Sequence, residues 1–186
     1  PQPKEGRTLG AYAGQRMPSS DGASTDALKR FVPRGEGQRT LPGCSSWTNG
    51  KCVQTKYAYM TGGPYPELSY AAMHQEITGG KMNRGSRPVD GIELIAKRGC
   101  PLATPNLPEW FGSPRNFPAD AVADRMSYRA DEWEECTSVD DVISAILNMD
   151  PVNLGFWWYD SDANPGPTGH LPVRGSGGRG GHSLIG

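Results

Sequence analysis

The segment Gln38-Arg39-Thr40-Leu41-Pro42-Gly43-Cys44 decides the fold that this sequence predicts. A helix is expected directly after it, over residues 45–60, so Cys44 stands at a helix start. Unpaired N–H groups and the helix dipole favour a thiolate at that place. The backbone N–H of Cys44 and the side-chain amide of Gln38 are suited to bind the oxygen of a carbonyl under attack. The segment therefore predicts a nucleophilic cysteine beside an oxyanion site.

A second segment, Gly180-Gly181-His182-Ser183-Leu184-Ile185, places a histidine at the start of a short apolar strand. We expect this strand to hold the ring against the thiolate, as a catalytic base requires. His182 follows Cys44 by 138 residues (182 − 44), and the base of papain-type enzymes follows the nucleophile by about 130–150 residues. His74, within an expected helix, and His170, in a Gly/Pro-rich loop, are interpreted as structural.

The order of these segments resembles the papain-like cysteine peptidases, especially their divergent bacterial and phage forms. The resemblance runs from about Gly35 to Gly186. Gln38, Cys44 and His182 match the family's oxyanion glutamine, nucleophile and base. Further matches are Leu68-Ser69 before a helix, Gly79-Gly80, the helix Val89–Gly99, and the helix Val139–Met149 that leads to Pro151-Val152.

The resemblance implies an α+β fold with a helical first lobe, an antiparallel β second lobe and a cleft between them. Residues 1–35 are expected to form an extended N-terminal arm, and residues 36–186 the papain-like domain. The resemblance also implies hydrolysis of peptide bonds through a thioester on Cys44, with a polypeptide substrate and no cofactor or metal.

The sequence departs from the family in two places. Ser45 stands where the family has a tryptophan, and Trp47 follows two residues later. No Asn or Asp follows His182, although the family orients its histidine with such a residue. We therefore expect the chain to continue past Gly186 into a segment that carries Asn or Asp beside His182.

Two other functions compete with the peptidase. One is a catalytically inactive papain-like protein with a structural or assembly role, such as a phage virion component, whose partner is a neighbouring structural protein. The other is a peptidoglycan-cleaving cysteine amidase of the NlpC type. That group has Asp before its cysteine and a much nearer histidine, and the sequence has neither.

Composition excludes several broad classes. The 186 residues carry a net charge of −1, which predicts neither nucleic-acid nor membrane binding. No apolar run approaches the roughly 20 residues of a membrane span, and no secretory signal is visible. The sequence leaves the location open, with the cytoplasm and a virion as the alternatives. Cysteines at 44, 52, 100 and 136 contain no CxxC pair, and we expect free thiols.

Periodicity and capping predict the remaining elements. The helix over 45–60 is expected to present Val53, Tyr57 and Met60 on one apolar face. The aromatic run Phe156–Tyr159 is interpreted as core and sheet face, with alternate members as candidates for a substrate groove. The other expected elements are a short helix over Thr25–Phe31, a helix from Ser69 to Ile77, a helix over Val89–Arg98, a Pro-rich irregular segment over 100–118, a strand over Met126–Trp133, a helix capped by Ser138 that buries Val139, Val142, Ile143, Ile146 and Leu147, and strands over Val152–Tyr159 and His182–Ile185.

Overall fold

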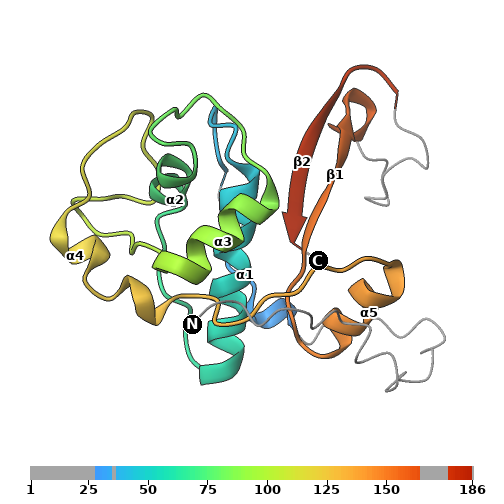
Figure 1. Cartoon of the computed structure of the whole chain (residues 1–186), viewed down its shortest axis with the longest axis horizontal. Coiled ribbons are helices and arrows are strands. Elements are labelled where there is room, and N and C mark those ends of the chain that lie inside the picture. The colour runs from blue at the N-terminus through green and yellow to red at the C-terminus, as the bar shows by residue number, and fades with distance from the viewer. Residues whose placement is uncertain (1–27, 35–36, 164–175, 186) are drawn as a thin grey trace.

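The computed structural model describes residues 28–34, 37–163 and 176–185. Helices gather on one side, which we call the helical lobe (α1–α4), and two antiparallel strands with one helix lie on the other, which we call the β lobe (β1, β2 and α5; Figure 1). The elements are η3 (Lys29–Phe31), α1 (Cys44–Thr61), α2 (Tyr70–Ile77), α3 (Pro88–Arg98), α4 (Ala119–Val122), η4 (Arg125–Ser127), α5 (Val139–Leu147), β1 (Asn153–Tyr159), η5 (Asp160–Ala163) and β2 (Arg179–Ile185).

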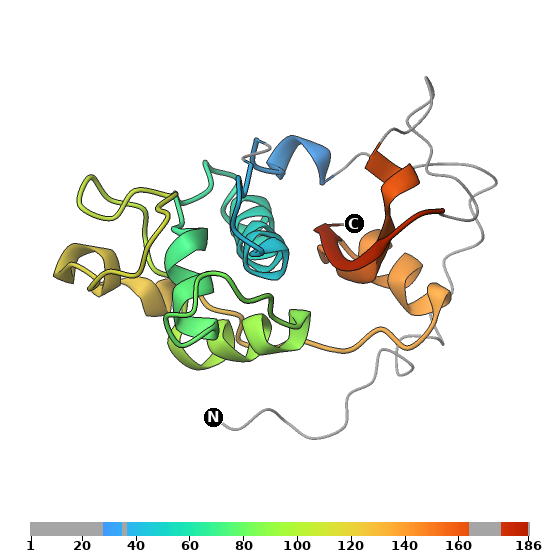
Figure 2. The same ribbon diagram turned by 90° about the horizontal axis from the view of Figure 1, so that it is seen from above.

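Helix α1 is the central element, because it contacts α2, α3, η3 and both strands. Figure 2, in which α1 is seen nearly end-on, shows it between the α2–α3 pair and the strands. Its buried residues are mostly small or polar. At Gly50 a Cβ would lie 2.6 Å from the Tyr70 ring, so this glycine allows the close approach of α2. The predicted apolar face holds at Val53, which packs against the core, and was wrong at Met60, which is 73% exposed.

The main hydrophobic core lies inside the helical lobe. Leu68, Met73 and Ile95 are fully buried there. The segment 100–118 is irregular, as its prolines predicted, and it still contributes the buried side chains of Leu107 and Phe111. Burial of each large side chain stabilises the fold by roughly 1.5–3 kcal/mol, so this segment stabilises the core without regular structure.

Side-chain caps begin two helices where the sequence predicted them. Ser69 Oγ accepts a hydrogen bond from the Ala72 N–H at 3.3 Å, and Ser138 Oγ accepts one from the Asp141 N–H at 3.1 Å. The predicted buried face of α5 was wrong. Val139 is 74% exposed and Ile143 49% exposed, and Ala145 is the buried residue of this helix. In Figure 1, α5 lies beyond the strands and away from the helical lobe.

Strands β1 and β2 pair antiparallel from Asn153 opposite Ile185 to Tyr159 opposite Arg179. Both strands were predicted, although β2 begins three residues before His182. The strand predicted over residues 126–133 was wrong. That segment begins with the 3-10 turn η4 and continues without a ladder.

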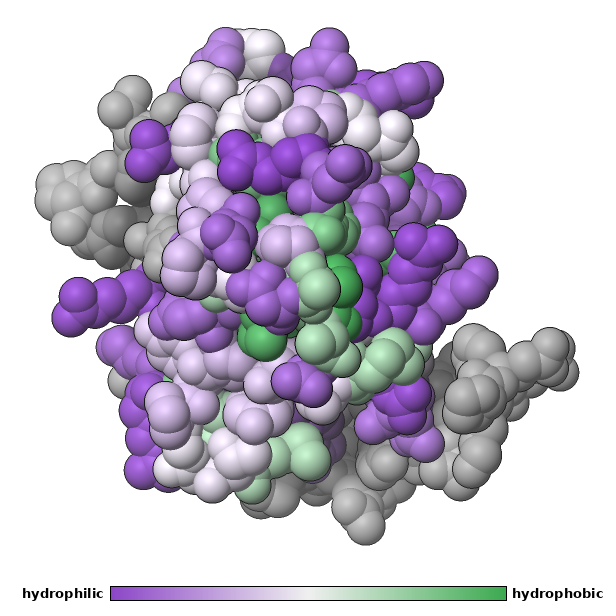
Figure 3. Space-filling view, turned by 90° about the vertical axis from the view of Figure 1, so that its left-hand side faces the viewer, coloured by the Kyte–Doolittle hydropathy of each residue, from purple (hydrophilic) through white to green (hydrophobic). Residues whose placement is uncertain are grey.

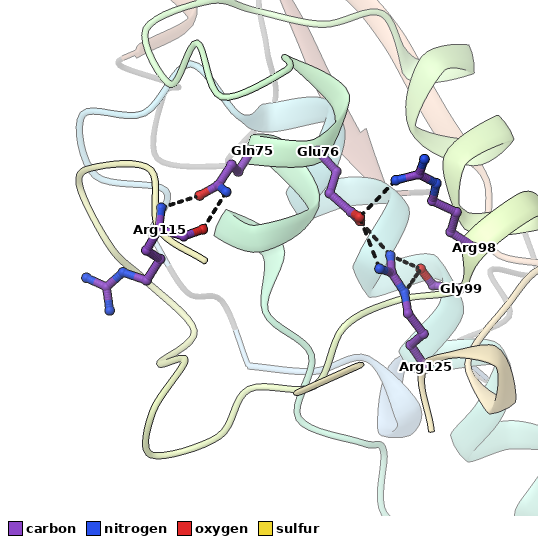
Figure 4. A network of polar contacts seen from close by, with 6 residues as sticks. All are labelled: Gln75, Glu76, Arg98, Gly99, Arg115 and Arg125. Carbon is purple, nitrogen blue, oxygen red and sulfur yellow. Dashed lines mark hydrogen bonds and ion pairs between the residues drawn. The ribbon is translucent and has the colours of Figure 1, made fainter. Parts of the chain in front are cut away.

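An ion pair attaches the start of η4 to the helical lobe. The Arg125 guanidinium binds Glu76 of α2 at 2.5 Å and the Gly99 carbonyl oxygen at 2.9 Å (Figure 4). Both charged side chains are almost buried, with 13% and 12% of their surface exposed. These contacts fasten the chain after α4 to the ends of α2 and α3.

The predicted helix over 25–31 is a 3-10 turn at Lys29–Phe31, and residues 25–27 lie outside the described residues. Phe31 packs edge-on against Tyr59 with ring centroids 5.6 Å apart, and the Lys51 Nζ donates a hydrogen bond to the Arg34 carbonyl at 2.7 Å. Residues 28–34 of the predicted arm therefore lie against α1. The domain boundary at residue 35 stays a prediction.

His74 is a structural residue, as the sequence indicated. It is fully buried in α2, its Nε2 lies 3.1 Å from the Met82 carbonyl oxygen, and its Nδ1 lies 3.5 Å from Ser46 Oγ. Because a carbonyl oxygen only accepts, Nε2 carries the proton and Nδ1 accepts from the serine hydroxyl. Burial lowers the pKa of His74.

Gly91 of α3 provides a direct test of how closely α1 and α3 pack. A Cβ at this position would lie 2.1 Å from Asn49 Nδ2, whose hydrogen bond to the Pro88 carbonyl oxygen is 2.9 Å long. Gly91→Ala should therefore lower the free energy of unfolding by about 1–3 kcal/mol, even though alanine favours an isolated helix by about 1 kcal/mol. Lys97→Ala, at an exposed position of the same helix, is the control, with an expected change within about 0.5 kcal/mol. Urea unfolding followed by circular dichroism measures both, and a stabilised Gly91→Ala variant would contradict the packing.

The buried His74 should make stability depend on pH. Because its pKa is lowered in the folded state, the unfolded chain binds more protons below the ordinary histidine pKa of about 6.5. The free energy of unfolding should thus hold above that pH and fall as the pH drops from about 6.5 toward 5. His74→Gln should make this fall shallower. Urea unfolding at pH 7.5 and 5.5 measures it, and an equal pH dependence in the two proteins would show that the ring is not held neutral.

Candidate active site

The first turn of α1 presents Cys44 on a firmly held backbone. Gly43 precedes the helix, and a Cβ there would lie 2.6 Å from the Trp47 ring, which therefore covers this glycine. Ser45 Oγ donates a hydrogen bond to the Arg87 carbonyl oxygen at 3.0 Å, which ties the turn to the start of α3. Trp47 is thus a core residue that shapes the helix entry, and Ser45 is a buried anchor.

Cys44 is half-buried, and α1 begins at this residue. All four cysteines are free thiols, as predicted. Burial raises the pKa of Cys52 to about 12 and also raises the pKa of Cys100. The pKa of Cys136 is raised by burial and by the nearby Asp141 and Glu134 carboxylates. These three thiols are therefore poor nucleophiles near neutral pH.

Gln38 begins the tight turn that leads into α1. Its carbonyl oxygen accepts a hydrogen bond from the Leu41 N–H at 3.1 Å, and Arg39 within the turn has a φ of 53°. The Arg39 guanidinium lies over the Trp110 ring at 4.5 Å, which attaches the turn to the helical lobe. Gln38 itself is half-buried and close in space to the chain that enters Cys44.

His182 lies in the middle of β2, directly opposite Phe156 of β1. Its ring contacts Trp158, with centroids 5.1 Å apart and planes at 65°, and Phe156 at 6.1 Å. The ring is half-buried, and this burial lowers the pKa of His182. The third histidine, His170, lies outside the described residues.

A chain of buried hydrogen bonds joins α1 to both strands, and we call it the interlobe hydrogen-bond chain (Thr48, Asn49, Asn153 and Ser183). Thr48 Oγ1 donates to the Ser183 carbonyl oxygen at 3.0 Å. Ser183 Oγ donates to Asn153 Oδ1, and Asn153 Nδ2 donates to Asn49 Oδ1 at 2.7 Å. Thr48, Asn49 and Ser183 are each less than 5% exposed, so the Thr48–Ser183 bond is buried, and the two bonds of the half-buried Asn153 are partly buried.

This chain brings the two predicted catalytic segments side by side. Thr48 lies one helical turn after Cys44, and Ser183 directly follows His182, so their 3.0 Å hydrogen bond sets β2 against the start of α1. The hydrogen bonds of the described residues do not include one between Cys44 and His182. The joint action of these two residues, and the oxyanion role of Gln38, stay predictions.

Sequence reasoning missed the interlobe hydrogen-bond chain. The residues that follow Cys44 along α1 are Ser45-Ser46-Trp47-Thr48-Asn49, which include poor helix formers at buried positions. Such residues inside a helix indicate that their side chains bond elsewhere. That pattern was the available clue, and hydrophobic periodicity does not detect it.

A shallow pocket on the helical lobe is not part of this site. It is lined by residues of α2 and the irregular segment, including Gln75, Glu76, Arg115 and Phe117. Gln75 exchanges two hydrogen bonds with the Arg115 backbone, at 2.7 and 2.9 Å, and Glu76 is bound by arginines (Figure 4). Its polar groups thus already bind one another. The end of the lobe that lies furthest from the strands is mostly polar, with a small hydrophobic group near its centre (Figure 3).

Within residues 28–34, 37–163 and 176–185, no group of three or more His, Cys, Asp or Glu side chains is arranged to hold a metal. No helix in the same ranges is sufficiently long and apolar to cross a membrane.

The fold is that of the papain-like cysteine peptidases, as the sequence predicted. The central helix of the helical lobe begins at a cysteine, and the antiparallel β lobe carries a histidine. Among solved structures, the chain is similar to xylellain, a cysteine protease from Xylella fastidiosa, with a TM-score of 0.59 and 17% sequence identity. The match covers 88% of this chain and 72% of the xylellain chain. No family model and no curated protein matches the sequence. The similarity is one of fold.

The hydrogen bond from Thr48 to β2 can be removed with little change of shape. Thr48→Val leaves the buried Ser183 carbonyl oxygen without this donor, and we expect the free energy of unfolding to fall by about 1–3 kcal/mol. Thr61→Val is the matched control, because the Thr61 hydroxyl donates to the Tyr57 carbonyl oxygen at the exposed end of the same helix. There the expected change is within about 0.5 kcal/mol. Chemical unfolding measures both substitutions. Equal changes in the free energy of unfolding would show that the Thr48–Ser183 bond stabilises the fold no more than an exposed hydrogen bond does.

Proposed function

We propose that this protein is a cysteine peptidase of papain type, with Cys44 as nucleophile and His182 as base. The observation that carries the proposal is the Thr48–Ser183 hydrogen bond, which sets the strand of His182 against the helix that Cys44 begins. The similarity of fold to a cysteine protease supports it. The substrate class is polypeptide.

In the proposed reaction the Cys44 thiolate attacks the carbonyl carbon of a peptide bond. The Cys44 N–H and the Gln38 side-chain amide donate hydrogen bonds to the oxyanion of the tetrahedral intermediate. The His182 imidazolium gives its proton to the leaving amine as the C–N bond breaks, and a thioester on Cys44 remains. Water, deprotonated by His182, then hydrolyses the thioester and restores the thiolate. The proposed steps use the side chains of Cys44, His182 and Gln38, the Cys44 backbone N–H, and water.

Selective alkylation tests the nucleophile. Brief iodoacetamide treatment at about pH 6 should label Cys44, while Cys52, Cys100 and Cys136 react slowly because their pKa values are raised. Peptide mapping by mass spectrometry measures the labelling at each cysteine. Cleavage of unfolded casein should be lost in Cys44→Ala.

His182→Ala should reduce the pH 6 labelling of Cys44 by about tenfold or more, since it removes the ion-pair partner. Leu184→Ala is the control, because this exposed residue lies two positions further along the same strand. Equal labelling of all four cysteines, or none at Cys44, would refute the peptidase and favour the alternative of an inactive papain-like structural protein.

A further inference from the structure

Two aromatic side chains of β1 lie on the same face of the sheet as His182. Phe156 is the direct cross-strand partner of His182, and Trp158 stands two residues further along β1. Because side chains alternate along a strand, Trp157 points to the opposite face. There the Arg179 guanidinium lies 4.7 Å from the Trp157 ring centroid, and this indole is 57% exposed. The tryptophan pair therefore offers two similar side chains, of which one contacts His182.

The register directs the Trp158 indole toward His182. Gly180 lies directly opposite Trp158 and has no side chain, so the diagonal neighbour His182 is the side chain that the indole meets. The two rings lie 5.1 Å apart at 65°, close to the edge-to-face arrangement that aromatic rings prefer. Phe156 contacts both rings, at 5.9 Å from Trp158 and 6.1 Å from His182.

A base on a strand needs something to fix its ring, because an imidazole turns about χ1 and χ2 unless a partner holds it. The ring–ring contacts of His182 among the described residues are these two, and the hydrogen bonds of the same residues include none to the His182 ring. Trp158 has the closer ring. It also shields the imidazole from water, in keeping with the half-buried state of His182.

We propose that Trp158 is a positioning residue that holds the His182 imidazole in the orientation required to pair with Cys44. This inference rests on the proposed function. It predicts that loss of the Trp158 ring slows the chemical step, because a misoriented base protonates the leaving group poorly, whereas the substrate still binds.

The test compares four proteins: wild type, Trp158→Leu, Trp158→Phe and Trp157→Leu. Leucine keeps an apolar side chain at position 158 and removes the ring, whereas phenylalanine keeps a ring. Trp158→Leu should lower kcat for a peptide substrate by about tenfold or more with KM within about twofold, and lower the pH 6 labelling rate of Cys44 in parallel. Trp158→Phe should restore most of both. Trp157→Leu, from the opposite face, should leave both near wild type.

Thermal unfolding of all four proteins separates positioning from folding, and the comparison uses variants that are folded at the assay temperature. If Trp158→Leu does not fold, Trp158→Phe and Trp158→Met are compared with Trp157→Leu in its place. Equal kcat in the Trp158 and Trp157 variants, or a loss that phenylalanine does not restore, would overturn the inference while the peptidase function stands. A wild-type protein that neither cleaves peptide nor labels selectively at Cys44 would overturn the proposed function, and this inference with it.

Discussion

The arrangement of the two lobes depends on the interlobe hydrogen-bond chain of Thr48, Asn49, Asn153 and Ser183. Apolar contacts tolerate sliding, whereas a buried hydrogen bond has a direction and a length, and an unpaired buried group is costly. Thr48 binds a main-chain oxygen of β2 at 3.0 Å, so it sets the position of that strand along α1 rather than its mere proximity. Asn49 reaches α3 as well as β1, because Gly91 leaves the space that it occupies.

The same constraint explains the unusual character of α1. A central helix that contacts neighbours on several sides needs no single apolar face, and α1 buries serine, threonine, asparagine and glutamine instead. Several of these polar groups find partners in neighbouring segments. Ser45 donates to the Arg87 carbonyl oxygen, and Gln54 donates to the Pro66 carbonyl oxygen at 2.5 Å and accepts from the Tyr70 hydroxyl. The Ser45 bond holds the first turn, where Cys44 stands half-buried, and the Gln54 bonds hold the middle of the helix.

Stability and candidate chemistry occupy different parts of the molecule. The helical lobe contains the hydrophobic core and the nearly buried ion pair between Glu76 and Arg125, which fastens the chain after α4 to α2. The candidate site lies where this lobe meets the β lobe, and aromatic rings rather than a core surround His182. A site at such a boundary combines a nucleophile on a rigid helix with a base on a separate strand, so the hydrogen bonds across the boundary decide their geometry.

The sequence by itself determined the helix that begins at Cys44, the capped starts at Ser69 and Ser138, and strands around Phe156 and His182, because caps, turns and β-branched or aromatic runs are local properties of the chain. The resemblance built on Gln38, Cys44 and His182 then indicated the papain-like fold. The buried face of α1, the absence of a strand over Met126–Trp133 and the contact of Thr48 with Ser183 emerge from the folded chain. These outcomes depend on partners far along the chain, and hydrophobic periodicity does not reveal which partner a polar side chain binds.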